Sequence, residues 1–172
     1  YFNHATHLYN AMRGLESREP GALGYLFDSN NIYCGIIPDG LHVHYSSISI
    51  AKKLLGDKLY MVTDAASPAG TNMTEFMFEG NLVFHKDGKC TDANGTLGGS
   101  ALVMIDGVKN LIRGAKFSYE EALKMATSYP AKAIQIDNQY GHIKPGYIAD
   151  LTYFDENFKV KGTISKGILE RY

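Results

Sequence analysis

Two histidines and a carboxylate follow three apolar runs of the chain, and these residue types favour metal-assisted hydrolysis. His7 comes directly after the first run, His42 closely follows the second, and Asp64 directly follows the third. A histidine can bind a divalent ion, the ion lowers the pKa of a bound water, and a nearby carboxylate can accept the proton of that water. We therefore predict one site built from these three side chains, if the surrounding elements bring the ends of the runs together.

The other histidines have simpler interpretations. His42 and His44 would point to the same side of an extended segment and could chelate a metal, although paired loop histidines also occur by chance. His4 lies three residues before the candidate ligand and would face away from it along a strand, so we expect it to be structural. His85 and His142 lie in turn-rich segments, and we expect no ligand role for either of them.

Anion binding is a second feature of the sequence. Residues 10–11 and 98–99 are predicted to form loops before helices, where free backbone N–H groups favour anions. The guanidinium of Arg18, in a loop beside a proline, suits a phosphate group. The alternatives are that the glycine pair provides only conformational freedom, and that Arg18 forms a surface ion pair with Glu16 or Glu19.

A short run at the start of the chain and two continuous apolar runs predict strands of a parallel sheet, and continuous apolar runs are typical of strands buried on both faces. The runs cover residues 1–6, 32–37 and 59–63, and they start roughly 27–31 residues apart, the size of a βαβ repeat. Helices over 19–28 and 46–55 fit between them, the first begun by a proline and the second capped by a serine. Functional residues gather where such strands end, which supports the candidate site.

After these runs the sequence predicts a hairpin of strands 76–78 and 82–85, followed by a turn at 87–88. Three helices are predicted next, over 100–113, 118–128 and 131–136. Two strands are predicted at the end, over 149–154 and 159–165. A complete (β/α)8 barrel needs about 250 residues. Because only three barrel strands are visible, we predict the C-terminal part of a larger α/β barrel. A small doubly wound domain is the alternative.

Composition excludes several classes of protein. The 172 residues include 17 Lys and Arg against 18 Asp and Glu, for a net charge of −1. This balance argues against nucleic acid or an anionic membrane as partner. No apolar run approaches the length of about 20 residues that a membrane span needs. Two cysteines do not make a disulfide framework, and they predict reduced thiols in a cytoplasmic protein.

Eight short blocks occur in order along nearly the whole chain: ATHLYNAM (5–12), REPG (18–21), IYCGIIPDGLHV (32–43), VTDA (62–65), PAG (68–70), NGTLGGS (94–100), YPAKA (129–133) and GHIKPG (141–146). Together they closely resemble the C-terminal half to two-thirds of the N-acetylglucosamine-6-phosphate deacetylase family, in the amidohydrolase superfamily. This resemblance implies a metal-dependent (β/α)8 TIM-type barrel plus a small β-sandwich domain built from both chain ends. Residues 1–140 would belong to the barrel, with a β-hairpin insertion near 74–91, and 141–172 to the sandwich.

The resemblance also implies a role for individual residues. His7 would be a metal ligand, and Asp64 the general base and then the general acid. Arg18 would reach the phosphate in the neighbouring subunit's site of a homodimer. His44 is not a ligand in that family, and the chelating interpretation is dropped. The implied substrate-binding residues are Asn10, Ala11, Arg18, Asp39, Gly40, Leu41, His42, Leu97, Gly98 and Gly99.

The implied reaction is hydrolysis of N-acetylglucosamine 6-phosphate to glucosamine 6-phosphate and acetate. One divalent ion per site is implied, with zinc expected first and iron, cobalt or manganese as alternatives. Because the family's glutamate ligand and second histidine ligand do not occur in these residues, we expect the chain alone to be inactive. The competing hypotheses are an amidohydrolase for another N-acyl or cyclic amide, and a non-catalytic sugar-phosphate sensor.

Overall fold

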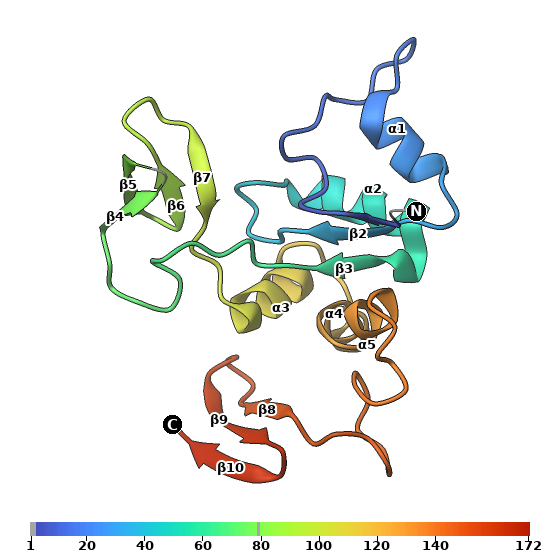
Figure 1. Ribbon diagram of the computed structural model, residues 1–172, viewed down its shortest axis with the longest axis vertical. Coiled ribbons are helices and arrows are strands. Elements are labelled where there is room, and N and C mark those ends of the chain that lie inside the picture. The colour runs from blue at the N-terminus through green and yellow to red at the C-terminus, as the bar shows by residue number, and fades with distance from the viewer. Residues whose placement is uncertain (1–2, 79) are drawn as a thin grey trace.

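A three-stranded parallel sheet forms the centre of the computed structural model, which describes residues 3–78 and 80–172 (Figure 1). Its strands are β1 (His4–Ala5), β2 (Tyr33–Ile36) and β3 (Leu59–Met61), in the order β1-β2-β3. All three predicted strands are thus present, shorter than predicted. The first two residues of the predicted first strand lie outside the described residues. The parallel register pairs Cys34 with Leu59 and Ile36 with Met61.

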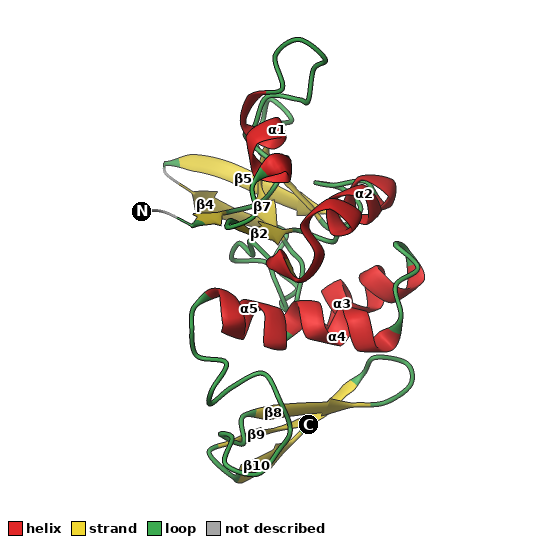
Figure 2. Cartoon of the chain, turned by 90° about the vertical axis from the view of Figure 1, so that its right-hand side faces the viewer, coloured by secondary structure: helices red, strands yellow, loops and turns green. Residues whose placement is uncertain are grey.

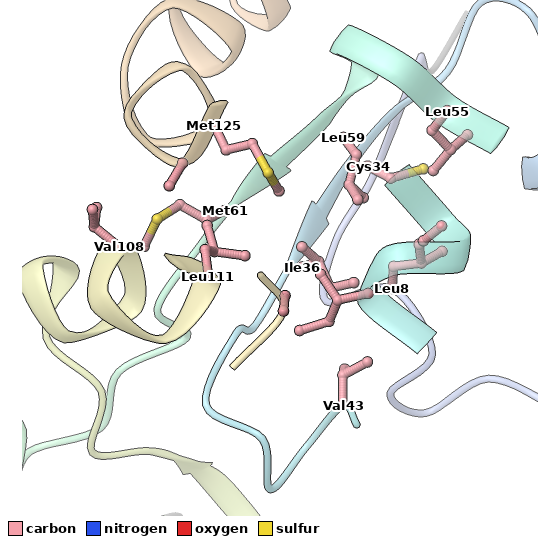
Figure 3. Packing of buried hydrophobic residues seen from close by; sticks show 14 of the residues in the cluster. Leu8, Cys34, Ile36, Val43, Leu55, Leu59, Met61, Val108, Leu111 and Met125 are labelled. Atoms are coloured by element: carbon pink, nitrogen blue, oxygen red, sulfur yellow. The ribbon is translucent and has the colours of Figure 1, made fainter. Parts of the chain in front are cut away.

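Both faces of this sheet are covered by helices, as the continuous apolar runs predict. α1 (Gly21–Asp28) and α2 (Tyr45–Leu55) connect the strands, and a short 3-10 helix, η1 (Gly56–Lys58), leads into β3. The close-up in Figure 3 shows Leu8, Val43 and Leu55 on the α2 side of the sheet. Met61 points the other way, toward helices of the C-terminal half of the chain. The predicted serine cap of α2 is wrong, because His44 is the N-cap and its Nδ1 accepts from the Ser46 amide.

Helices α3 (Met104–Arg113), α4 (Tyr119–Ala126) and α5 (Ser128–Ala133) cover the second face. The predicted cap of α4 is confirmed, since the Ser118 hydroxyl accepts a hydrogen bond from the Glu121 amide at 3.1 Å. The predicted start of α3 at residue 100 is wrong. Residues 97–100 are a strand instead, and the helix begins four residues later than predicted.

That strand belongs to a four-stranded antiparallel sheet beside the end of β3 (Figure 1). It contains β4 (Glu75–Phe78), β5 (Asn81–Lys86), β6 (Lys89–Thr91) and β7 (Leu97–Ser100) in sequence order. The predicted hairpin is confirmed, although Glu79 of its turn lies outside the described residues. The predicted turn at 87–88 has φ values of 51° and 78°, which suit the twist of a tight hairpin.

The C-terminal segment forms a separate three-stranded antiparallel sheet, β10-β9-β8. Its strands are β8 (Leu151–Phe154), β9 (Val160–Ser165) and β10 (Ile168–Arg171), of which the last was not predicted. Figures 1 and 2 place this sheet below α3, α4 and α5, which separate it from the parallel sheet. Phe158, in the turn between β8 and β9, packs this sheet against α4 by stacking on Tyr119, with ring centroids 5.7 Å apart. Among the described residues, no helix is both long and apolar enough to cross a membrane.

Candidate active site at the ends of three strands

The parallel sheet brings the three candidate segments to one edge. Its hydrogen-bond ladder continues past the strand ends, because Leu8 donates to the Gly35 carbonyl at 2.8 Å and Val62 donates to the Ile36 carbonyl at 2.9 Å. The chain segments that follow β1, β2 and β3 therefore leave the sheet side by side, and they contain His7, residues 39–42 and Asp64. The predicted convergence at the carboxyl ends of parallel strands is present.

His7 turns sharply out of β1, with a φ of 34°. Non-glycine residues with positive φ are uncommon, and they persist where the surrounding structure holds them, often at functional sites. The Nδ1 atom of His7 is buried and has no hydrogen-bond partner among the described residues. A buried imidazole nitrogen without a partner is costly, so a ligand that completes its bonding, such as a metal ion, fits this position.

The described residues do not form a complete metal centre by themselves. No group of three or more His, Cys, Asp or Glu side chains among them is close enough to hold an ion. A catalytic zinc site in general has three protein ligands. His7 is therefore one candidate ligand and needs others, as the sequence predicts.

Asp39 and His42 form a tight, nearly buried pair in the loop after β2. His42 donates from Nδ1 to Oδ2 of Asp39 at 2.5 Å, and the two side chains are only 6% and 7% exposed. The other carboxylate oxygen, Oδ1, accepts from the amides of Leu41 and His42, both at 2.8 Å. The carboxylate thus stabilises the loop through one oxygen and holds the imidazole through the other.

This pairing shifts the pKa values of both groups. Burial alone would raise the pKa of Asp39, but the hydrogen bonds from His42 and Leu41 outweigh burial and lower it. The hydrogen bond to Asp39 raises the pKa of His42 against the opposing effect of burial, and the negative charge of Asp64 raises it further. Asp39 is therefore an ionised acceptor at neutral pH, and Nδ1 of His42 must carry a proton.

Asp64 lies at the end of β3 with an exposed side chain and a φ of 50°. Its backbone carbonyl accepts from the Ser100 amide at 2.9 Å, and the Ser100 carbonyl accepts from the Ala66 amide at 2.7 Å. The buried Ser100 hydroxyl also donates to the Thr63 carbonyl. Sequence reasoning missed Ser100 because it placed this residue at a helix start.

The segment 97–99 lies beside Asp64 as strand β7, and the prediction that its glycine pair precedes a helix directly is wrong. Gly99 has a φ of 78°, and a Cβ built there would lie 3.3 Å from the Asp64 carbonyl oxygen. This glycine therefore allows a close approach of two backbones at the site. Leu97 is exposed, and Gly98 is half-buried.

Gly40 and Leu41 connect the loop after β2 to its surroundings. Gly40 has a φ of 75°, and a Cβ there would lie 2.8 Å from the ring of Tyr45. A Cβ built on Gly88 of the β5–β6 turn would lie 3.6 Å from Leu41 Cδ1, so this side chain reaches the four-stranded sheet. The loop that holds His42 is thus packed from both sides.

The segment after β1 is a turn. Its residues Tyr9 and Ala11 have φ values of 77° and 53°, and α1 begins only at Gly21. Residues 10–11 thus lie in a loop before α1, as predicted, but ten residues from its first turn. Asn10 donates from Nδ2 to the Leu8 carbonyl at 3.4 Å and remains half-buried beside the strand ends.

Arg18 lies apart from these residues, exposed in the loop that leads into α1. Segment 13–20 extends beyond the rest of the chain at the top of Figures 1 and 2. The nearby Glu16 pairs with Arg13 at 3.1 Å. No ion pair of Arg18 with Glu16 or Glu19 is present among the described residues, so that alternative is not supported.

The remaining histidines have the structural roles that the sequence indicates. His4 is hydrogen-bonded through Nε2 to the Ala133 carbonyl at 2.8 Å, and His85 through Nδ1 to the Met73 carbonyl at 2.9 Å. His142 packs edge-on against Tyr147.

A parallel sheet covered by helices, with histidine and aspartate after the ends of its strands, defines a class of protein. Comparison with known families identifies this class. The chain belongs to the amidohydrolase family, whose pattern matches residues 2–169. It is 42% identical over 166 residues to N-acetylglucosamine-6-phosphate deacetylase of Haemophilus influenzae, covering 95% of this chain and 43% of that protein. It is also 42% identical over 156 residues to N-acetylgalactosamine-6-phosphate deacetylase of Shewanella sp. strain ANA-3, covering 90% of this chain and 39% of that protein.

The fold agrees with a solved structure of the same kind. The crystal structure of N-acetylglucosamine-6-phosphate deacetylase from Pasteurella multocida matches with a TM-score of 0.96 and 47% sequence identity. The match covers 99% of this chain and 45% of that one. The predicted fold class, part of a barrel with additional strands, is confirmed, and the chain spans less than half the length of these relatives. The boundary near residue 140 stays a prediction.

Proposed function

We propose that this chain is part of an enzyme that hydrolyses N-acetylglucosamine 6-phosphate to glucosamine 6-phosphate and acetate. The observation that carries the proposal is that the segments containing His7, the Asp39–His42 pair and Asp64 all leave the same edge of the parallel sheet. The names of the relatives from Haemophilus and Pasteurella support the substrate. A sugar-phosphate sensor would not need both a metal-type histidine and an exposed general base at the same edge of the sheet.

The chain's own residues supply the proton transfers. Asp64 accepts a proton from the attacking water and later returns it to the amide nitrogen, because an amine anion is a poor leaving group. The exposed carboxylate of Asp64 suits this exchange with a substrate. The unprotonated Nε2 of His42 accepts a hydrogen bond from an N–H or O–H group of the sugar and so orients the N-acetyl group.

His7 would hold a divalent ion, together with ligands outside the described residues. Such an ion supplies a water that loses its proton near neutral pH. We propose zinc, since an imidazole suits it, with iron, cobalt or manganese as alternatives. The two free cysteines support a reducing location, and we propose the cytoplasm.

The sugar and its phosphate would be bound by the residues around this centre. In the proposal Asn10 and Ala11 hold the phosphate, while segment 97–99 closes over the sugar beside Asp64. Arg18 projects from the loop 13–20 to the phosphate in the neighbouring site of a homodimer. Its exposure, and the extension of this loop beyond the rest of the chain, support a contact with a second copy.

A second candidate substrate is N-acetylgalactosamine 6-phosphate. The relative from Shewanella is as similar in sequence as the one from Haemophilus, and its name gives the galactosamine substrate. The two sugars differ only in the configuration at C4, so the proton transfers would be the same.

Acetate release from the natural full-length protein, loaded with zinc, tests the proposal. N-acetylglucosamine 6-phosphate, its galactosamine epimer and unphosphorylated N-acetylglucosamine are compared at equal concentration. We expect the highest kcat/KM for the first compound and the lowest for the third. A higher kcat/KM for the epimer would make N-acetylgalactosamine 6-phosphate the proposed substrate instead. Release of no acetate from any of the three compounds would contradict the proposed function.

A further inference from the structure

The carboxylate of Asp39 makes more contacts than a loop cap requires. Its Oδ1 atom alone accepts both backbone amides, from Leu41 and His42, and this is sufficient to stabilise the turn. Within the described part of the chain, its Oδ2 atom bonds only to Nδ1 of His42. With 7% of its side chain exposed, Asp39 has little surface left for direct contact with a substrate.

The pair has two consequences for His42. An ionised carboxylate can only accept, so the proton of this hydrogen bond belongs to Nδ1 of the ring. The 2.5 Å contact also prevents rotation of the ring about its side-chain bonds, since rotation would leave two nearly buried polar groups without partners. Nε2 is then the ring nitrogen that remains available.

We propose that Asp39 is a positioning residue that acts through His42, fixing the orientation of the imidazole and placing its proton on Nδ1, rather than a residue that binds substrate directly. The expected effect of Asp39 on turnover rests on the proposed function, whereas its effect on the His42 ring does not. The charged and titratable groups that face the pair are Asp64, near His42, and Tyr45, near Asp39. Neither of them is hydrogen-bonded to Asp39 or to the ring of His42 in the described structure.

The variant Asp39→Asn separates this role from loop stabilisation. Asparagine keeps an Oδ1 acceptor for the two backbone amides, but it places an N–H donor where Oδ2 accepted from His42. The imidazole must then accept at Nδ1 and carry its proton on Nε2. We expect kcat for N-acetylglucosamine 6-phosphate to fall about 100-fold, because Nε2 then carries a proton where the substrate group needs an acceptor, and KM to change less than threefold.

Asp155→Asn is the matched control. Oδ1 of Asp155 also accepts two backbone amides, from Asn157 and Lys159, both at 2.9 Å, in the turn between β8 and β9. This turn lies in the C-terminal sheet, beyond the helices that cover the parallel sheet (Figure 1). We expect Asp155→Asn to leave kcat unchanged.

Two further measurements make the test decisive. In a His42→Ala background, Asp39→Asn should change kcat less than twofold, because the residue through which it acts is absent. An equal loss in both backgrounds would overturn the inference. The 15N shifts of the His42 ring, assigned by difference from His42→Ala, should show a protonated Nδ1 in the natural protein and an unprotonated Nδ1 in Asp39→Asn.

These shifts do not depend on catalytic activity. An unprotonated Nδ1 in the natural protein would overturn the inference even if the enzyme deacetylates its substrate. If the natural protein releases no acetate, the proposed function fails, and the ring shifts alone decide whether Asp39 positions His42.

Discussion

The two residues proposed for metal binding and proton transfer share a backbone conformation that few non-glycine residues adopt. His7 and Asp64 both have positive φ, and they lie two and three residues after the ends of β1 and β3. This conformation turns the chain out of the sheet within one residue and presents the side chain at its edge. The strain, typically about 1–3 kcal/mol per residue, is maintained by the surrounding hydrogen bonds.

Asp64→Asn should abolish proton transfer while preserving the backbone, because asparagine tolerates positive φ well. Loss of general acid–base catalysis typically lowers the rate by about 10²–10⁴-fold. Because Asp64 acts as both general base and general acid, we expect kcat to fall by about 10⁴-fold or more. Steady-state kinetics of the full-length variant measure this, and near-normal turnover would contradict the role of Asp64.

His7→Ala should lower metal occupancy before it alters folding. Ala11, four residues further on, already adopts positive φ, so alanine is compatible with this turn. Metal analysis of the purified full-length variant, beside a thermal melt, provides the measurement. Full occupancy with unchanged affinity would return His7 to a structural role.

Residue types predict part of this site, and contacts across the fold determine the rest. His7, His42 and Asp64 were predicted from their positions after apolar runs, and the structure brings their segments together. The bond from Asp39 to His42 was not predicted, because a carboxylate three residues from a histidine has many possible orientations. Ser100 was missed because its partners, Thr63 and Ala66, are far from it in the sequence.

At the scale of elements, strands buried on both faces were easier to predict than strands defined by their neighbours. β2 and β3 consist of apolar residues whose burial needs helices on both sides, and this pattern is visible locally. β7 contains two glycines and is a strand because it pairs with β6 and bonds to residues 64–66. Such pairing over long sequence distance leaves no local signal, and the predicted helix start at residue 100 was wrong for this reason.

The contact between α2, α3 and the loop after β2 depends on the absence of a side chain at Gly114. A Cβ at this position would lie 2.4 Å from the ring of Tyr45, which also lies against Gly40. Gly114→Ala should therefore displace the ring and destabilise the protein by about 1–3 kcal/mol, the usual cost of overpacking. Thermal melts measure the loss. Gly14→Ala is the control, because a Cβ at Gly14 meets nothing within 4 Å, and equal melting temperatures of the two variants would contradict this packing.

The loop 13–20 gives a prediction about phosphate. A charge-assisted hydrogen bond contributes about 1.5–3 kcal/mol, so Arg18→Ala should lower kcat/KM for the 6-phosphate substrate roughly 10–150-fold. Activity on unphosphorylated N-acetylglucosamine should hardly change. Arg13→Ala, which breaks only the exposed pair with Glu16, is the control. Equal losses on both substrates would show that Arg18 acts on structure or assembly instead.

At the scale of the whole molecule, the chain has one well-defined core and several surfaces without partners. An apolar groove of about 690 Å³ separates α3, α4 and α5 from the segment that leads into β8. Every residue of β10 is exposed. Within the described residues, β1 and β3 are the edges of the parallel sheet. Unpaired strand edges and uncovered apolar surface favour association with further chain.

The 172 residues expressed alone should therefore be inactive. Only His7 is assigned as a metal ligand, and no group of three ligating side chains occurs among the described residues. We expect weak metal binding, poor solubility and no acetate release, with the natural full-length protein as control. Metal-dependent deacetylation by a species with a measured mass of 19.0 kDa would require a complete site within this chain.

The bridge between Ala65 and Ser100 has an evolutionary consequence. The chain leaves the barrel after β3 and returns through β7 at almost the same point. The four-stranded sheet is therefore an insertion whose two ends lie side by side. Strands of this insertion can lengthen, shorten or be exchanged between relatives without shifting the register of the barrel. Asp64 would stay in place while the surface beside it changes. Substrate range and catalytic chemistry can therefore diverge at different speeds in the same lineage.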